Sequence, residues 1–151
     1  KVHRYCENLV VNTILTKMAK QAQSLHIDLR LDILIPRQIP VNEYEFAMVL
    51  ANLLENAVFS VQNMEPAKKS IDAKIHCTAE YLLIDMENEC TKEIHFDSIT
   101  GLPKSKRGKS HGLGMQSVQA FSDKLGGNIE CYCENNRFRI ILFVKFSPHF
   151  T

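Results

Sequence analysis

The sequence lacks an apolar run long enough to form a membrane-spanning helix. No stretch approaches the roughly 20 apolar residues with which a helix crosses a bilayer, so we expect no membrane contact from this chain. No signal peptide is visible and the chain begins at Lys1. We therefore interpret residues 1–151 as one domain that is a fragment of a longer protein.

The sequence also lacks an excess of charge of either sign. Its 18 lysines and arginines nearly balance its 17 aspartates and glutamates, which leaves a formal net charge of +1. This balance gives no reason to expect nucleic acid or an acidic membrane surface as a partner. The apolar content of 45% is ordinary for a globular domain and can fill a core.

The cysteines lack the number and spacing of a disulfide framework or a zinc site. They are odd in number, and the five are Cys6, Cys77, Cys90, Cys131 and Cys133. The last two flank Tyr132, so in a strand their side chains share one face. We expect all five to be buried, reduced thiols, which indicates a cytoplasmic domain.

A helix over residues 43–63 is the element around which the rest of the chain is organised. Its apolar residues recur at spacings of three and four, which is one face of an amphipathic helix: Phe46, Leu50, Leu53, Ala57 and Val61. Asn52 and Asn56 lie one turn apart on a polar stripe beside that face, and Glu55 points away. Half-buried amides need partners. These are either neighbouring backbone groups or a bound ion or ligand.

The remaining elements follow from periodicity and turn residues. We expect helices over 2–25 and 113–125, and strands over 27–35, 70–78, 81–88, 128–133 and 137–146. We expect Asn42 to cap the central helix, with Glu45 as its capping-box partner. The order predicts an α+β fold, with the helices on one face of a mostly antiparallel sheet.

Residues 91–111 lack periodicity and are rich in lysine and arginine. A loop of this length in a compact domain is usually either a functional lid or a solvated, disordered segment. We expect it to be mobile without a ligand.

The motif Asn52-Leu53-Leu54-Glu55-Asn56-Ala57 resembles the asparagine box of the GHKL superfamily of histidine kinases and related ATPases. The resemblance implies that Asn56 binds the Mg²⁺ that bridges the phosphates of ATP. Gyrase-type members carry a glutamate, the general base, where this chain has Asn52. An amide cannot take a proton from water, so the difference favours the kinase branch.

The run from Lys106 to Gly114 resembles a second family motif, a lysine followed by His-Gly-x-Gly. The resemblance implies that the N–H groups of Gly112 and Gly114, on either side of Leu113, hold phosphate at the start of a helix.

Three side chains of the same run would add to this phosphate site. Lys106 or Lys109 would reach the terminal phosphates. His111 is either a further donor or lid latch, or an ordinary exposed histidine.

The family's first glycine box, Asp-x-Gly-x-Gly, is missing after the strand 81–88. One subgroup, which includes peptide quorum-sensing receptors and which residues 5–12 also resemble, commonly has an asparagine there. Asn88 is the match, and its amide oxygen would accept from the adenine amino group. Asp85 is the rival. Strand alternation puts the two on opposite faces, and we choose Asn88.

Taken over nearly the whole chain, the resemblance implies the two-layer Bergerat sandwich of a sensor histidine kinase catalytic domain in a two-component system. Such a domain binds Mg·ATP and passes the γ-phosphoryl group to a histidine on a separate dimerisation domain, and from there indirectly to a response regulator. We expect a monomer from a homodimeric parent, inactive in autophosphorylation when isolated. His3 does not resemble an acceptor.

Two alternatives stay open. One is an ATPase or anti-sigma-type kinase of the same fold, against which the absent glutamate at position 52 argues. The other is a degenerate nucleotide-sensing or interaction module, because the first glycine box is missing.

Overall fold

The described part of this computed structural model, residues 3–90 and 109–147 with backbone alone for 109–113, forms two layers. Its helices are α1 (Leu9–Ser24), α2 (Glu43–Val61) and α3 (Lys109–Lys124), with a short 3₁₀ turn, η1 (Pro66–Lys68). Its strands are β1 (Asp28–Leu34), β2 (Ser70–Cys77), β3 (Tyr81–Glu89), β4 (Asn128–Glu134) and β5 (Arg137–Lys145). The predicted α+β class is confirmed.

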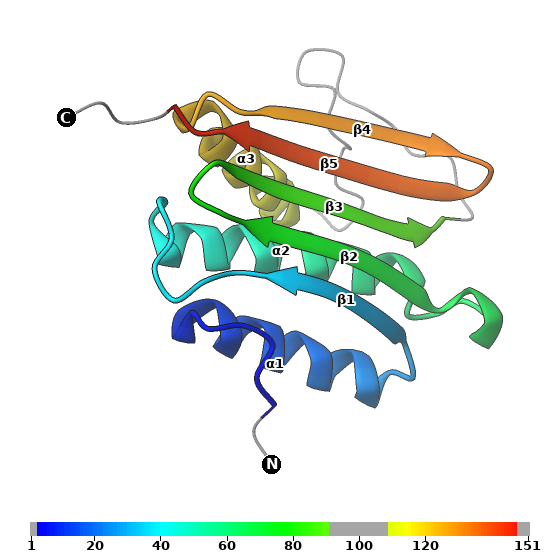
Figure 1. Cartoon of the computed structure of the whole chain (residues 1–151). Coiled ribbons are helices and arrows are strands. Elements are labelled where there is room, and N and C mark those ends of the chain that lie inside the picture. Colours follow the sequence, from blue (N-terminus) through cyan, green and yellow to red (C-terminus); the bar gives the residue numbers. More distant parts are fainter. Residues whose placement is uncertain (1–2, 91–108, 148–151) are drawn as a thin grey trace.

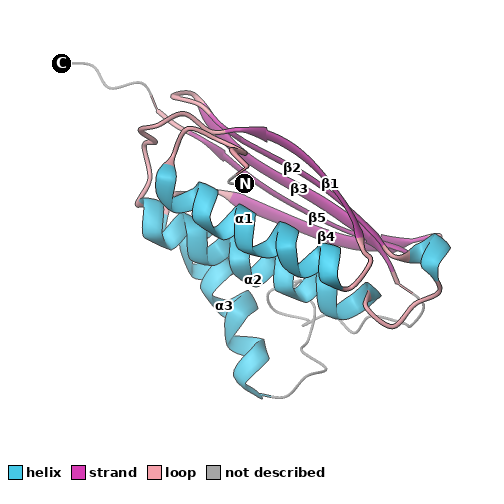
Figure 2. Cartoon of the chain, turned by 90° about the horizontal axis from the view of Figure 1, so that it is seen from below, coloured by secondary structure: helices cyan, strands magenta, loops and turns pink. Residues whose placement is uncertain are grey.

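The five strands form one sheet in the order β1-β2-β3-β5-β4 (Figure 1). Only β1 and β2 pair in parallel, and the other neighbours are antiparallel. The three helices lie together on one face of this sheet (Figure 2). The mixed, mostly antiparallel sheet and the one-sided helix layer are therefore both as the sequence predicts.

The core lies between the helices and the sheet. Residues of β2 and β3 alternate between buried positions and positions that are half-buried or exposed, because successive side chains of a strand point to opposite faces. The other face carries ion pairs. Arg30 and Arg137 both bond the Asp72 carboxylate, which lies between them. The hydrogen bond from the guanidinium of Arg30 holds the pKa of Asp72 below its ordinary value; burial opposes this shift, and Arg137 adds to it.

Helix α1 begins later than the periodicity predicts, at Leu9 instead of residue 2. Asn8 is its cap, and the Oδ1 of Asn8 accepts from the Val11 N–H at 3.0 Å. The Nδ2 of the same side chain donates to the Arg37 carbonyl and to the Glu43 carboxylate, at 2.9 and 2.8 Å. Asn8 is thus buried and joins α1 to the start of α2, and is not an ordinary surface amide.

Helix α2 has the cap that the sequence predicts. The Oδ1 of Asn42 accepts from the backbone N–H groups of Tyr44 and Glu45, both at 3.0 Å. The capping-box role of Glu45 is wrong, since its carboxylate instead receives Lys124 of α3 at 3.0 Å. A tertiary ion pair has replaced the local contact.

The turns around the last two strands use residues with positive φ. Gly126, with φ at +69°, ends α3, and Asn135 and Asn136 join β4 to β5 with φ at +52° and +62°. Asparagine tolerates this left-handed conformation better than most residues.

Helix α3 starts at Lys109, four residues before the predicted start. Residues 109–111 therefore belong to the helix and not to the basic loop. The rest of the predicted lid, 91–108, lies outside the described residues.

The prediction of five buried thiols is only partly correct. None of the five cysteines is in a disulfide, but Cys131 is half-buried and Cys133 is exposed. Strand β4 is an edge strand, so its side chains have a neighbouring strand on one side only. None of the helices within the described ranges is both long and apolar enough to span a membrane.

Candidate functional site

Helices α2 and α3 run antiparallel, and this packing builds one wall of the candidate site. At one end, Glu45 of α2 binds Lys124 of α3, and Phe46 stacks on Phe121 with ring centroids 6.2 Å apart. At the other end, the late turns of α2 therefore lie beside the first turns of α3. This is where the two predicted motifs meet.

Asn52 and Asn56 both face this meeting point. The Nδ2 of Asn56 donates to the sulfur of Met115 at 3.3 Å. A methyl group added at Gly114 would lie 3.5 Å from Cγ of Asn52, so the backbone of α3 comes close to that side chain. Both amides are half-buried. The structure thus brings the asparagine motif and part of the glycine motif together.

The glycines occupy different places in the helix. The free N–H groups of a helix are those of its N-cap and its first three residues; in α1 and α2 the N–H of the fourth residue already donates to the N-cap carbonyl. Gly112 is the fourth residue of α3. Gly114 lies beyond it, in the second turn. The phosphate role of both glycines stays a prediction. Of Lys109, His111 and Leu113 the structure describes the backbone alone, and Lys106 lies outside the described residues.

Asn88 lies on the helix-facing side of β3, where it is 3% exposed and follows the buried Ile84 and Met86. Its Nδ2 donates to the Glu89 carbonyl at 2.9 Å. Within the described part of the chain its Oδ1 accepts no hydrogen bond. A polar acceptor is therefore present on the inner face of the sheet, below the helix layer.

Asp85 lies on the opposite face, as strand alternation predicts. Its carboxylate accepts two hydrogen bonds from Arg139, at 2.9 and 2.7 Å. The hydrogen bonding of Arg139 to the Asp85 carboxylate raises the pKa of Arg139 above its ordinary value. Asp85 is thus engaged in an ion pair away from the helices, and it does not share a site with Asn56.

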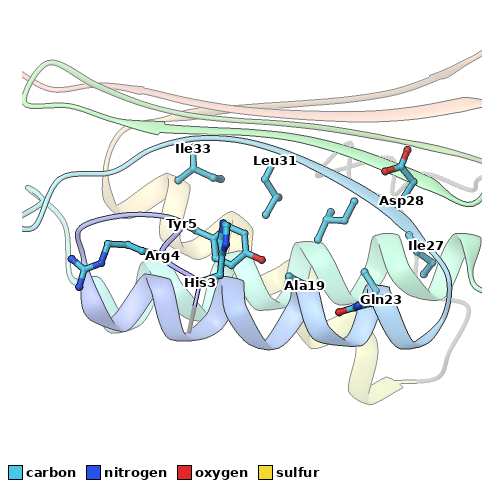
Figure 3. A pocket seen from close by; sticks show the side chains of 11 residues that line it. His3, Arg4, Tyr5, Ala19, Gln23, Ile27, Asp28, Leu31 and Ile33 are labelled. Carbon is cyan, nitrogen blue, oxygen red and sulfur yellow. The ribbon is translucent and has the colours of Figure 1, made fainter. Parts of the chain in front are cut away.

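A cavity of about 600 Å³ lies elsewhere, between α1 and β1 (Figure 3). Tyr5, Ala19, Gln23, Leu31 and Ile33 are among its lining residues, and none of the predicted site residues is. Within the described residues no three acidic, histidine or cysteine side chains form a metal cluster.

Met115 lies on the apolar face of the last helix, and this position predicts a core side chain and not a site residue. It is buried as expected, yet its sulfur also accepts from Asn56. No signal within the sequence joins two residues that are 59 positions apart.

Comparison with solved structures shows the same fold in histidine kinase catalytic domains. The nucleotide-free catalytic domain of histidine kinase ThkA is 15% identical over 93% of both chains, with a TM-score of 0.67. The Acinetobacter baumannii histidine kinase AdeS is 16% identical over 92% of this chain and 64% of its own, with a TM-score of 0.67. The mycobacterial sensor histidine kinase MprB is 15% identical over 93% and 95%, with a TM-score of 0.60. At these identities the likeness is one of fold.

Sequence comparison supplies the family. No curated protein matches the sequence. The family described as the GHKL domain matches residues 41–145, a span that includes Asn52, Asn56, Asn88 and the glycines of α3. The motifs, the two-layer fold and this match agree, and the chain belongs to the GHKL family.

Proposed function

We propose that this chain is the catalytic, ATP-binding domain of a sensor histidine kinase. It binds Mg·ATP and donates the γ-phosphoryl group to a histidine on a separate dimerisation domain of the same receptor. The observation that carries this proposal is the approach of Asn52 and Asn56 to Gly114 and Met115. It joins the asparagine motif to the glycine motif in a chain of the GHKL family.

The amide of Asn56 fits the ion. Its Nδ2 donates to a sulfur of α3, and a carbonyl-type oxygen is a ligand that suits the hard ion Mg²⁺. When bound, the ion would neutralise charge on the phosphates. The N–H groups at the start of α3 would hold phosphate oxygens, with Lys106 or Lys109 adding positive charge and His111 a further donor.

Asn88 is the residue that we propose to bind adenine. Its Oδ1 lies on a nearly buried strand, accepts nothing within the described residues, and is therefore suited to the exocyclic amino group of adenine. In a mostly buried site this hydrogen bond would favour adenine strongly over a base without an amino group at that position, because the other base would leave the Asn88 oxygen without a donor.

The residue at position 52 distinguishes a kinase from an ATPase. An amide cannot serve as general base for water, so the chain would transfer phosphate by positioning and electrostatics, and not hydrolyse ATP. The acceptor histidine is expected outside residues 1–151, so the isolated chain should be inactive in autophosphorylation. The isolated domain would be a monomer in the cytoplasm, and the full receptor to which it belongs would be a homodimer. A response regulator would be an indirect partner.

Two measurements on the purified chain test this function. Calorimetric titration with a non-hydrolysable ATP analogue and Mg²⁺ should show binding, and absence of binding would instead favour a degenerate module. Radiolabelled ATP should label a dimerisation domain added in trans, and leave this chain unlabelled. The Asn56→Ala variant is the control for contamination. Phosphate release that continues at the same rate in this variant comes from a contaminating enzyme. Release or stable self-labelling that Asn56→Ala removes would contradict the proposal.

A further inference from the structure

Two cysteines, one directly after β3 and one in β4, meet at one end of the sheet. The sulfur of Cys90, directly after β3, lies 2.8 Å from the sulfur of Cys133 in β4, 43 residues further along the chain. The bond length of a disulfide is about 2.0 Å. A closure of less than about 1 Å would therefore bring this pair to bonding distance.

Backbone pairing holds the two residues in place. The Cys90 N–H donates to the Asn136 carbonyl at 2.7 Å, which extends the β3–β5 ladder by one residue. Cys133 pairs with Phe138 of β5, and Phe138 pairs with Asn88 of β3. The sheet register thus brings the two residues to the same end of the sheet, where their sulfurs are in contact.

The two thiols differ in their access to solvent. Cys133 is exposed, while Cys90 is 7% exposed. Redox-sensitive sites commonly pair an accessible thiol that reacts first with a second thiol that resolves the product. Here the exposed thiol is already in contact with its potential resolving partner.

The geometry points to a reversible redox modification site formed by Cys90 and Cys133, with a peroxide or a small-molecule disulfide as oxidant. With peroxide, the Cys133 thiolate attacks one oxygen, the O–O bond breaks, and hydroxide leaves a sulfenic acid on Cys133. The sulfur of Cys90 then attacks that of Cys133, the S–O bond breaks, and water leaves as the S–S bond forms. Two electrons pass from the thiols to the peroxide.

Cys131 is the natural control. It lies two residues before Cys133 on the same strand and face, opposite Ile140. Burial raises the pKa of its thiol to about 12, so it carries almost no thiolate at neutral pH. Cys131 should therefore stay reduced under conditions that oxidise Cys133.

The site lies close to Asn88, since Cys90 follows it by two residues. An S–S bond would tie the end of β3 to the β4–β5 hairpin at that point. The oxidation itself does not depend on nucleotide binding, so its test is independent of the proposed function.

The experiment treats the reduced chain, at low protein concentration, with hydrogen peroxide or oxidised glutathione. Remaining thiols are alkylated, and the chain is digested without reductant for mass spectrometry. We expect one Cys90–Cys133 cross-link within the chain, two fewer of the five thiols available for alkylation, and full reversal by a dithiol reductant. Cys131→Ser should retain the cross-link, while Cys90→Ser and Cys133→Ser should lose it.

Retention of all five thiols under conditions that oxidise a small-molecule dithiol would overturn the proposal. So would cross-links that join two chains or involve Cys131 in the folded protein. If a serine variant does not fold, the peptide map of the wild-type chain and of Cys131→Ser still decides the question.

Discussion

Replacement of Asn56 by alanine tests the proposed ion site most directly. The change removes the amide that meets α3 and adds no bulk. It should leave the fold intact and weaken nucleotide binding only where Mg²⁺ is present.

The structure allows the cost in stability to be worked out. The mutant loses the hydrogen bond to the Met115 sulfur, a weak acceptor, at a cost of about 0.5–1 kcal/mol. Alanine favours a helix interior by about 0.5 kcal/mol over asparagine, which offsets part of this loss. The net change is small against a total stability of about 5–15 kcal/mol.

The expected cost in binding is larger. A bond from a neutral group to a charged one contributes about 1.5–3 kcal/mol. Its loss should raise the Kd for the Mg·ATP analogue about 10- to 150-fold. Without Mg²⁺, wild type and mutant should bind the nucleotide equally.

Calorimetric titrations with Mg²⁺ and with EDTA measure both quantities, and urea denaturation checks the fold. Asn63→Ala is the matched control, because this asparagine belongs to the same polar stripe but is exposed beyond the end of α2. Its Kd should match the wild-type value. If Asn56→Ala binds the Mg·nucleotide as wild type does, the assignment of the ion ligand is wrong.

Three further predictions concern the sheet and its turns. Asn88→Ala should weaken the binding of ATP and of ADP alike, by about 2- to 13-fold for one lost hydrogen bond of about 0.5–1.5 kcal/mol, whereas Asp85→Ala on the opposite face should change neither titration; a loss confined to ATP would move the adenine contact elsewhere. Gly127→Ala should lower the free energy of unfolding by about 1–3 kcal/mol in urea, because the new methyl would lie 2.7 Å from Cγ2 of Val144; an unchanged midpoint would contradict this. The guanidinium on β1 lowers the pKa of Asp72, so this carboxylate stabilises the fold above its unfolded pKa of about 3.9 and loses that effect as pH falls through the lower, folded pKa. Urea midpoints between pH 2 and 6 should therefore fall less steeply for Asp72→Asn, and equal slopes would show that the ion pair adds nothing.

Much of the fold could be predicted from local patterns. The apolar spacing within 43–63 predicts α2, and the alternation around residues 28–34 and 70–89 predicts three strands. Asn42 caps α2 as expected, and Asn135 and Asn136 form the last turn. These features depend on contacts between residues a few positions apart, so they can be predicted from the local sequence.

The predicted start of α1 was wrong because distant groups decide it. Apolar periodicity continues past residue 9 toward the N-terminus, yet α1 begins at Leu9. Asn8 caps it while bonding to Arg37 and Glu43, which lie 29 and 35 residues away. Glu45 could have completed a capping box, but Lys124 of another helix binds its carboxylate.

The sequence by itself determined which residue types stand at which helical or strand phase, and hence that Asn88 and Asp85 face opposite ways. Only the tertiary structure decided which of the two faces the helices, because that depends on the side of the sheet on which α2 and α3 pack. The same holds for the contact of Asn56 with Met115 and of Cys90 with Cys133. Backbone sterics and hydrogen bonding act over a few residues, whereas these pairs are 59 and 43 residues apart, and strand order and helix packing bring them together.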